Sequence, residues 1–266
     1  MLVSARGVRI NVLEHGSGDP VILLHGVGCT AQTLTPQLEA LAPTRRALAV
    51  DFRGHGASDR TYGRMSLRDY ADDVLAVMSE LGIDRAAVVG VSMGGMVAQA
   101  MALSAPDRVT ALVLADTCAR ADAEMAAGMK AVGSLAATEG MKTAAEHVKP
   151  VTFCAAALVE NRPYVQEFEE GFRANDPLTF GVAMAALAEL DFLDDLPRIT
   201  VPTLVLVGAE DVLTRLEYSE AIAAAVPGAE LRVIEKAGHL SNLDQSEVFN
   251  DHLIRFLDGT RQGETA

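Results

Sequence analysis

Residues 86–103 read AAVVGVSMGGMVAQAMAL and predict a buried strand, a sharp turn and a helix. The apolar run Ala86–Gly90 is typical of a strand covered on both faces, and the small residues that follow Ser92 favour a helix. Gly90 and Gly94 stand two residues before and after Ser92, where a side chain would collide with adjacent backbone. We therefore expect the turn to lift the Ser92 hydroxyl above the sheet.

Strands and helices alternate along much of the remaining chain, which predicts an α/β fold with a mostly parallel, doubly wound sheet. The alternating residues 8–12 suggest an early hairpin that turns at the Gly16–Pro20 break. Further strands are expected at 21–24, 47–51, 110–115, 203–207 and 230–234, and helices at 31–42, 67–81, 216–225 and 242–257.

The alternation stops between Ala119 and Leu193, where the sequence is helical in character without a clear strand. Pro150, Pro163 and Pro177 are expected to divide this stretch into short helices. We interpret residues 119–193 as a helical cap inserted after one strand. The core is then formed by residues 1–118 and 194–266.

Composition narrows the class of protein. The 266 residues carry a formal net charge of −14, which disfavours nucleic acid and anionic membranes as partners. The three cysteines, Cys29, Cys118 and Cys154, are widely spaced and suggest neither a disulfide framework nor a zinc site. Residues 1–7 lack the apolar segment of a signal peptide, and no stretch is long enough to span a membrane. A cytoplasmic location is expected.

A serine nucleophile needs a base and an orienting carboxylate. His239 lies just past the last predicted strand, where functional groups collect in open α/β sheets. Asp211 follows the preceding strand and completes the order Ser92, Asp211, His239 that accompanies this kind of turn. Glu210 and Asp116 are alternative acids. The other histidines, His15, His25, His55, His147 and His252, are expected to be structural or surface residues, with His15 in the hairpin turn.

Acyl transfer also needs two donors for the oxyanion. The Met93 N–H begins the predicted helix after Ser92, and a helix N-terminus favours negative charge. The loop after an earlier strand, which contains His25, Gly26 and Val27, suggests the Val27 N–H as the second donor. No metal or organic cofactor is required by this chemistry.

The same loop supports a competing interpretation. Residues 26–31, GVGCTA, match G-x-G-x-x-A after a strand, and Asp51 lies about 20 residues beyond, as in dinucleotide-binding units. This alternative leaves Ser92, Asp211 and His239 without a role.

These motifs, taken together, resemble the α/β-hydrolase fold superfamily over essentially the whole chain. The carrying segments are Leu24–Gly26, Asp51–Ser58 (DFRGHGAS), Gly90–Gly95, Asp211 and Gly238–His239. Within it, residues 36–41, 51–58 and 112–117 look most similar to 3-oxoadipate enol-lactonases and small carboxylesterases. The resemblance implies a cofactor-free hydrolase that cleaves a small-molecule ester or lactone through an acyl-enzyme.

Other members of the superfamily share most of these features. They include C–C bond hydrolases, cofactor-free haloperoxidases and signalling hydrolases that act as small-molecule receptors with slow turnover. Enol-lactonases act on an acidic substrate, so a cation near the pocket is expected. Arg120, Arg162 and Arg173 are candidates, with surface positions as the alternative. We expect the cap to close over an apolar pocket lined by Met, Phe and Leu. Substrate identity and oligomeric state stay open.

Overall fold

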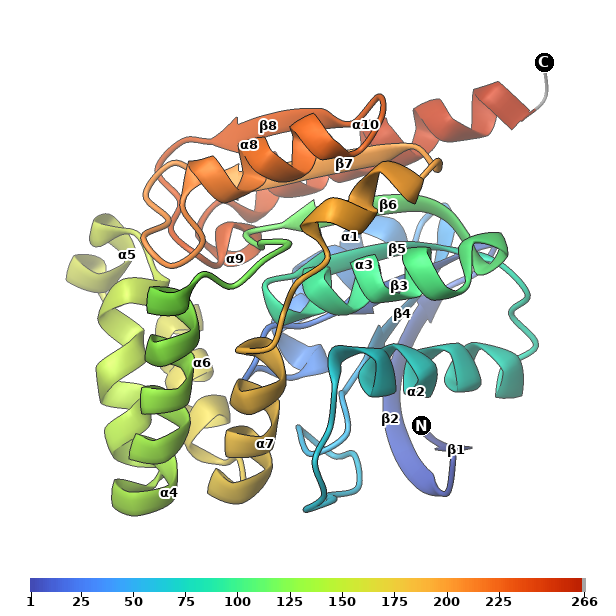
Figure 1. Ribbon diagram of the computed structural model, residues 1–266. Coiled ribbons are helices and arrows are strands. Elements are labelled where there is room, and N and C mark those ends of the chain that lie inside the picture. Colours follow the sequence, from blue (N-terminus) through green and yellow to red (C-terminus); the bar gives the residue numbers. More distant parts are fainter. Residues whose placement is uncertain (265–266) are drawn as a thin grey trace.

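One eight-stranded sheet organises the molecule (Figure 1). The computed structural model describes residues 1–264, with side chains described as far as Thr260. The strands follow the order β1-β2-β4-β3-β5-β6-β7-β8, and all neighbours from β4 to β8 run parallel. The predicted mostly parallel sheet is confirmed. The strands are β1 (Leu2–Ala5), β2 (Val8–Gly16), β3 (Asp19–Leu24), β4 (Arg45–Val50), β5 (Ala86–Val91), β6 (Val109–Ala115), β7 (Thr203–Gly208) and β8 (Glu230–Ile234).

Helices cover both faces of this sheet because alternate residues of each central strand point to opposite sides. Ile22 and Leu24 pack with α2 (Leu67–Glu80), α3 (Met93–Ser104) and α8 (Leu216–Ala225). Val21 and Leu23 pack with the opposite group. That second group contains η1 (Ala31–Leu34), α1 (Thr35–Leu41) and α10 (Ser246–Glu264), with the short α9 (Ser241–Asp244) before α10.

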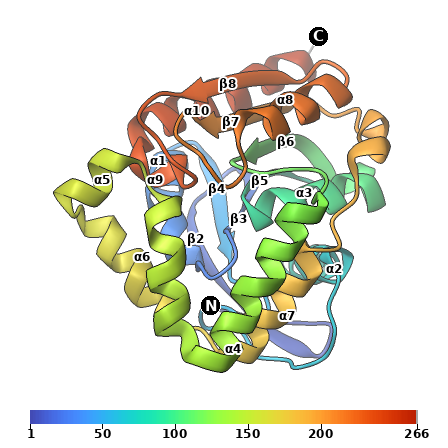
Figure 2. The same cartoon turned by 60° about the vertical axis from the view of Figure 1, so that its left-hand side comes forward.

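Four further helices lie beyond the carboxyl ends of the strands (Figure 2). They are α4 (Ala123–Thr152), α5 (Ala155–Glu160), α6 (Pro163–Arg173) and α7 (Pro177–Leu187). The η3 turn (Leu193–Arg198) and the short η2 turn (Pro106–Arg108) precede β7 and β6, respectively. These four helices occupy the stretch interpreted as a cap, and the boundaries at 119 and 193 stay a prediction.

The prolines of this stretch mark some of its helix boundaries but not all of them. Pro163 and Pro177 begin α6 and α7, where a missing N–H costs no hydrogen bond. The prediction that Pro150 separates two helices is wrong, because it lies inside the last turn of α4. The break in helical geometry comes instead at Gly140, whose φ of 88° suits glycine.

The first turn of the chain also differs from the prediction. The β1–β2 hairpin turns at Arg6 and Gly7, which both have positive φ. The break after Gly16 leads to β3, but β4 lies between β2 and β3 in the sheet. His15 is therefore not in a turn, because it lies on β2 opposite Ala47.

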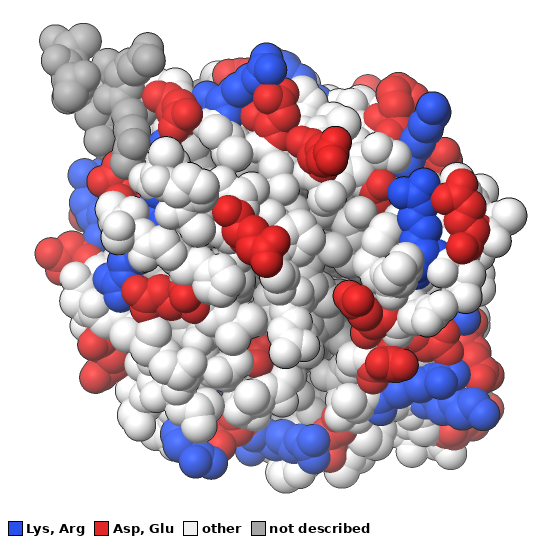
Figure 3. Space-filling model, turned by 180° about the vertical axis from the view of Figure 1, so that it is seen from behind, with Lys and Arg blue, Asp and Glu red and all other residues white. Residues whose placement is uncertain are grey.

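Charge is mixed on the face opposite to that of Figure 1. Figure 3 shows acidic and basic side chains interspersed over this face. Within residues 1–264, no helix is long and apolar enough to cross a membrane.

Helix α3 approaches the sheet very closely at Gly94. A Cβ at this position would overlap the Leu24 backbone carbonyl of β3. Gly171, within α6, provides the opposite case, because a Cβ there would meet open space. Substitutions at the two glycines therefore distinguish a steric requirement for glycine from the general effect of glycine on helix stability.

We expect Gly94→Ala to lower the free energy of unfolding by about 3 kcal/mol, the upper range for overpacking, because the clash is with backbone. Gly171→Ala is the matched control and should raise stability by up to about 1 kcal/mol, since alanine is the better helix former. Urea denaturation measures both. Equal stability of the two variants would contradict the close approach at Gly94.

Candidate active site

Ser92 occupies a strained turn between β5 and α3. Its φ of 54° and ψ of −118° are unusual for a residue with a side chain. A Cβ at Gly90 would overlap the Gly94 carbonyl, so the turn closes only with glycine at that position. The Ser92 N–H donates to Ala115 O at 2.9 Å, and Thr117 Oγ1 donates to Ser92 O at 2.8 Å. Strand β6 thereby holds the turn from the side.

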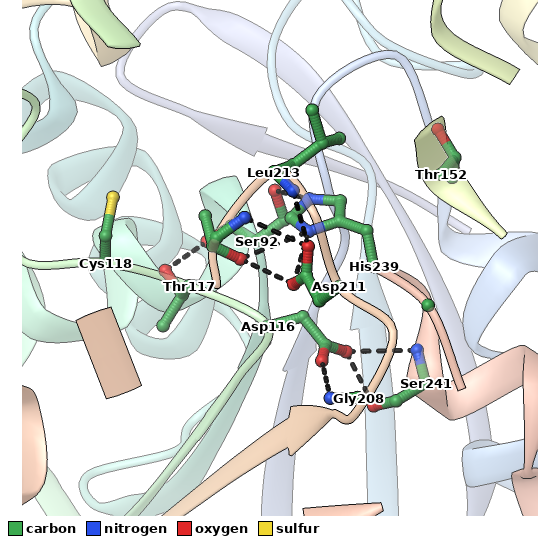
Figure 4. A network of polar contacts seen from close by, with 12 residues as sticks. Ser92, Asp116, Thr117, Cys118, Thr152, Gly208, Asp211, Leu213, His239 and Ser241 are labelled. Atoms are coloured by element: carbon green, nitrogen blue, oxygen red, sulfur yellow. Dashed lines mark hydrogen bonds and ion pairs between the residues drawn. The ribbon is translucent and has the colours of Figure 1, made fainter. Parts of the chain in front are cut away.

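Ser92, His239 and Asp211 form one hydrogen-bonded chain (Figure 4). Ser92 Oγ lies 2.8 Å from His239 Nε2, and His239 Nδ1 lies 2.9 Å from Asp211 Oδ2. All three side chains are buried. The carboxyl ends of β5, β7 and β8 bring together residues separated by up to 147 positions. The geometry suits a serine whose proton passes to a histidine that a carboxylate orients.

The Asp211 carboxylate is fixed by its own loop. Oδ1 accepts from the Leu213 N–H at 2.8 Å and the Thr214 N–H at 3.0 Å. Oδ2 accepts from Thr214 Oγ1 at 2.8 Å in addition to His239. Burial opposes ionisation, but attraction to the His239 ring and the hydrogen bonds from His239 and Thr214 outweigh it and hold the pKa of Asp211 below its ordinary value.

The His239 ring is correspondingly easier to protonate. Burial lowers the pKa of the imidazole, but attraction and hydrogen bonding to Asp211, with a further contribution from Asp116, bring the pKa above its ordinary value. A base with a raised pKa accepts the serine proton more readily and, once protonated, is stabilised by the carboxylate.

The two alternative acids are engaged elsewhere. Asp116 accepts from the Gly208 N–H at 2.9 Å and from Ser241 Oγ and N–H at 2.6 and 3.1 Å. It thus ties the end of β7 to the segment that follows His239. Burial, with repulsion from Asp211, raises the pKa of Asp116 to about 7. Glu210 accepts from the Ala155 N–H at 3.1 Å, next to α5.

The two predicted oxyanion donors lie at the same end of the sheet. Met93 is the first residue of α3, so its N–H has no acceptor within the helix. Val27 lies in the loop after β3, and its N–H has no acceptor among the described residues. Both N–H groups are therefore available for a developing oxyanion.

His25 and Cys29 together set the direction of the Val27 N–H. The Cys29 N–H donates to Gly26 O at 3.1 Å. His25 Nε2 accepts from the Phe52 N–H at 3.1 Å, so the neutral ring carries its proton on Nδ1, which donates to Gly26 O at 2.7 Å. Burial lowers the pKa of His25, which keeps the ring neutral. Because the Gly26–Val27 peptide is trans, fixing the Gly26 carbonyl points the Val27 N–H the opposite way.

The dinucleotide interpretation does not fit this loop. Asp51 is buried and accepts from the Ala31 N–H at 2.6 Å, the Asn11 amide at 2.9 Å and the Ala57 N–H at 2.9 Å. Its carboxylate therefore has no oxygen directed at a ribose. Gly28 is covered by the Phe172 ring, which a Cβ would overlap. Within the described residues, no cluster of acidic, His and Cys side chains could hold a metal ion.

The remaining histidines have separate places. His55 packs against His25 with ring centroids 5.3 Å apart, and burial lowers the pKa of His55 to about 3. His147 is exposed and lines a cavity near Ser92, whereas His252 lies on α10. None of these rings contacts Ser92 or Asp211.

A cavity of about 720 Å³ opens above Ser92 and His239. Its walls are mostly Met, Phe, Leu and Val side chains from α4, α6, α7 and the loop after β7. The predicted cap arginines do not line it. Arg120 pairs with Asp191 and Asp194, Arg162 with Glu160, and Arg173 with Glu146 and Glu169.

Comparison with known proteins identifies the family to which the chain belongs. A family model described as the alpha/beta hydrolase fold matches residues 19–246. The chain belongs to this family. The prediction of an α/β-hydrolase that resembles enol-lactonases and esterases is confirmed.

Relatives of this α/β-hydrolase carry names for related chemistries. A 3-oxoadipate enol-lactonase from Acinetobacter baylyi is 26% identical over 250 residues, 93% of this chain and 92% of the relative. A protein named as a carbamate hydrolase from a Caulobacter species is 32% identical, with 90% of each chain covered. The structure of a thermophilic esterase from Thermogutta terrifontis superposes with a TM-score of 0.92 at 29% identity, covering 98% of both chains.

Sequence reasoning missed several residues that support the hydrolase site. Thr214 contacts both Asp211 and His239, but a threonine three residues after an acid is a weak signal by itself. Asn175 donates from its amide to Gly28 O at 2.8 Å and so ties α6 to the Val27 loop. Its partner is 147 positions away, and no local pattern indicates it.

We expect His25→Leu to lower kcat about 10–100-fold, because the Gly26 carbonyl then keeps only the Cys29 N–H as a donor and the Val27 N–H is held less firmly. This is less than the about 10²–10³-fold cost of removing an oxyanion donor outright. His25→Asn is the matched variant, since its amide can still donate to Gly26 O, and it should retain more of kcat. Ester hydrolysis at saturating substrate measures the difference. Equal loss in both variants would contradict the anchoring role.

Proposed function

We propose that this α/β-hydrolase cleaves carboxylic esters or lactones with Ser92 as nucleophile, His239 as general base and Asp211 as the orienting acid. The observation that carries the proposal is the 2.8 Å contact between Ser92 Oγ and His239 Nε2, continued at 2.9 Å to Asp211. A serine hydroxyl is a weak nucleophile until such a base removes its proton.

The first half-reaction forms an acyl-enzyme. Ser92 Oγ bonds to the carbonyl carbon while its proton moves to His239 Nε2, and the carbonyl oxygen becomes an oxyanion. The N–H groups of Val27 and Met93 donate to that oxygen. When the tetrahedral intermediate collapses, the C–O bond breaks and His239 returns the proton to the leaving alkoxide.

Hydrolysis of the acyl-enzyme repeats these steps with water. His239 takes a proton from water, and the resulting hydroxide adds to the acyl carbon. The oxyanion forms again at Val27 and Met93, the bond to Ser92 Oγ breaks, and His239 returns the proton to the serine. Asp211 keeps the Nδ1–H tautomer and stabilises the imidazolium in both halves.

The names of two of these relatives support an acyl-transfer reaction with oxygen leaving groups. The enol-lactonase and the esterase cover nearly the whole chain at 26% and 29% identity. A lactone differs from an open ester only in that the alcohol stays tethered to the acyl group, so the same residues serve both substrates. The substrate of this chain is a small molecule that fits the cavity of about 720 Å³.

We expect Ser92→Ala to lower kcat for p-nitrophenyl acetate by at least about 10⁴-fold, because no other group supplies the nucleophile. A fluorophosphonate probe should add one adduct to the wild-type chain, which peptide mass spectrometry maps to Ser92. Turnover retained by Ser92→Ala, or an adduct on another residue, would contradict the proposal.

We expect kcat/KM to fall as the pH is lowered, with a midpoint above 6.5, because the base must be neutral and the pKa of His239 is raised. Asp211→Asn removes the carboxylate that raises the pKa of His239. The variant should lose about 10⁴-fold in kcat, and the midpoint of its residual activity should move to lower pH. A pH–rate profile of both proteins is the measurement, and an unshifted midpoint would argue against Asp211 as the partner.

A further inference from the structure

We propose that the substrate is an uncharged ester or lactone with an apolar acyl chain, and that the site rejects acyl groups that end in a carboxylate. This inference rests on the proposed function and names the substrate class of the same site. Two observations support it. The side chains that line the inner cavity are apolar, and the charged side chains nearby are paired with one another or lie at the rim.

The inner part of the cavity, which we call the acyl lobe, is formed by Phe168, Phe172, Phe180 and Met184. These side chains are at most 7% exposed. Phe172 lies between the other two rings, with centroids 5.5 Å from Phe168 and 5.1 Å from Phe180. Such a wall offers contact area to hydrocarbon and no hydrogen bond to a charged group.

Polar groups near the lobe have partners within the protein. Thr152, which also lines the cavity, donates from Oγ1 to Val148 O at 2.8 Å. Asn175, two residues after the end of α6, donates from its amide to Gly28 O and to two carbonyls of α6. The lobe therefore has no free donor from these residues for a carboxylate.

Charged side chains reach only the rim of the cavity. Asp122, Glu124 and Arg215 line it, and all three are exposed, as is His147, which also lines it. Asp122 caps α4 through the Met125 N–H at 2.8 Å and accepts from Tyr218 Oη at 2.7 Å. Acids outnumber the one arginine at this rim, so its charge does not favour an anionic substrate.

The positive side chains that an acidic substrate requires are engaged away from the cavity. Arg173 contacts Glu169 and Glu146, and Lys149 contacts Glu169 at 2.7 Å. Among side chains described up to Thr260, no lysine lines the cavity, and Arg215 at the rim is its one arginine. A carboxylate placed in the acyl lobe would lose its hydration without gaining a cation, which is unfavourable.

The position of His239 indicates which end of the substrate faces which wall. The leaving oxygen must reach His239 Nε2 to receive its proton. The rim residues Val212 and Leu213 belong to the loop of Asp211, which contacts His239, and both are exposed. The alcohol therefore departs along this open side, and the acyl chain that stays on Ser92 extends toward the acyl lobe.

This class differs from what the names of two relatives specify. The enol-lactone of 3-oxoadipate, a dicarboxylic acid, keeps one free carboxylate on a substituent of the carbon that bears its leaving oxygen. In the orientation above this carboxylate faces the open side, and the rim of the cavity offers one arginine against two acids. Carbamate has four non-hydrogen atoms and would leave most of the cavity of about 720 Å³ unfilled. An apolar acyl chain fills the lobe and meets complementary side chains.

The deciding experiment compares p-nitrophenyl hexanoate with the mono-p-nitrophenyl ester of adipic acid, which has the same chain length but ends in a carboxylate. We expect kcat/KM to be about 100-fold higher for the hexanoate at pH 7.5, where the carboxylate is ionised. The hexanoate should also exceed the acetate at least about 10-fold, because four more methylenes are buried. Equal values for the hexanoate and the adipate ester, or no gain from acetate to hexanoate, would overturn the proposal.

A variant tests whether the lack of a cation in the cavity causes the preference for the hexanoate over the adipate ester. Met129 lines the cavity one turn before Gly133, where α4 faces Met184. Met129→Lys should narrow the hexanoate-to-adipate ratio about 10-fold, whereas the uncharged Met129→Leu should keep it. An unchanged ratio in a folded Met129→Lys would count against the charge argument, and the wild-type substrate pair decides the proposal if that variant does not fold.

The fluorophosphonate adduct separates the two proposals. If Ser92 is labelled but the enol-lactone of 3-oxoadipate is hydrolysed faster than every neutral ester, the substrate class is wrong and the acyl-enzyme stands. If Ser92 is not labelled, the proposed function fails, and with it the inference built on it.

Discussion

The turn at Ser92 depends on backbone contacts that leave no room for a side chain at Gly90 or Gly94. These contacts hold Ser92 at a positive φ, and Ala115 and Thr117 of the neighbouring strand segment secure it by hydrogen bonds. The fold tolerates this strain because the turn is flanked by the buried strand β5 and the buried helix α3. The Ser92 hydroxyl and the Met93 N–H both take their positions from this one turn.

Buried carboxylates join this turn to the rest of the site. Asp116 links the end of β7 to the start of α9, and Asp211 is held by two N–H groups of its own loop. Asp244 accepts from the Gly238 N–H and the Cys154 N–H at 2.8 Å each, so the loop of His239 is bonded to the segment that leads into α5. Each carboxylate accepts hydrogen bonds from several groups at once. A shift of one loop therefore changes the hydrogen bonds of the others.

The helices α4–α7 serve the site in two ways. Asn175 and Phe172 contact the loop that contains Val27, so these helices help to position the Val27 peptide. The apolar side chains of α4, α6 and α7 close the cavity above Ser92. The geometry of the loop that contains Val27 and the shape of the cavity therefore depend on the same helices, although different residues carry them.

The sequence by itself determined most of the strands and helices along the chain, the turn at Ser92, and the loops in which Asp211 and His239 lie. These features are local, since glycine spacing and apolar periodicity report the backbone of their own segment. Only the tertiary structure decided that Asp211 rather than Asp116 contacts His239, that His25 orients the Val27 peptide, and that the cap arginines pair away from the cavity. Each of these depends on which distant groups meet in space, and a carboxylate or guanidinium binds whichever partner the packing brings within reach.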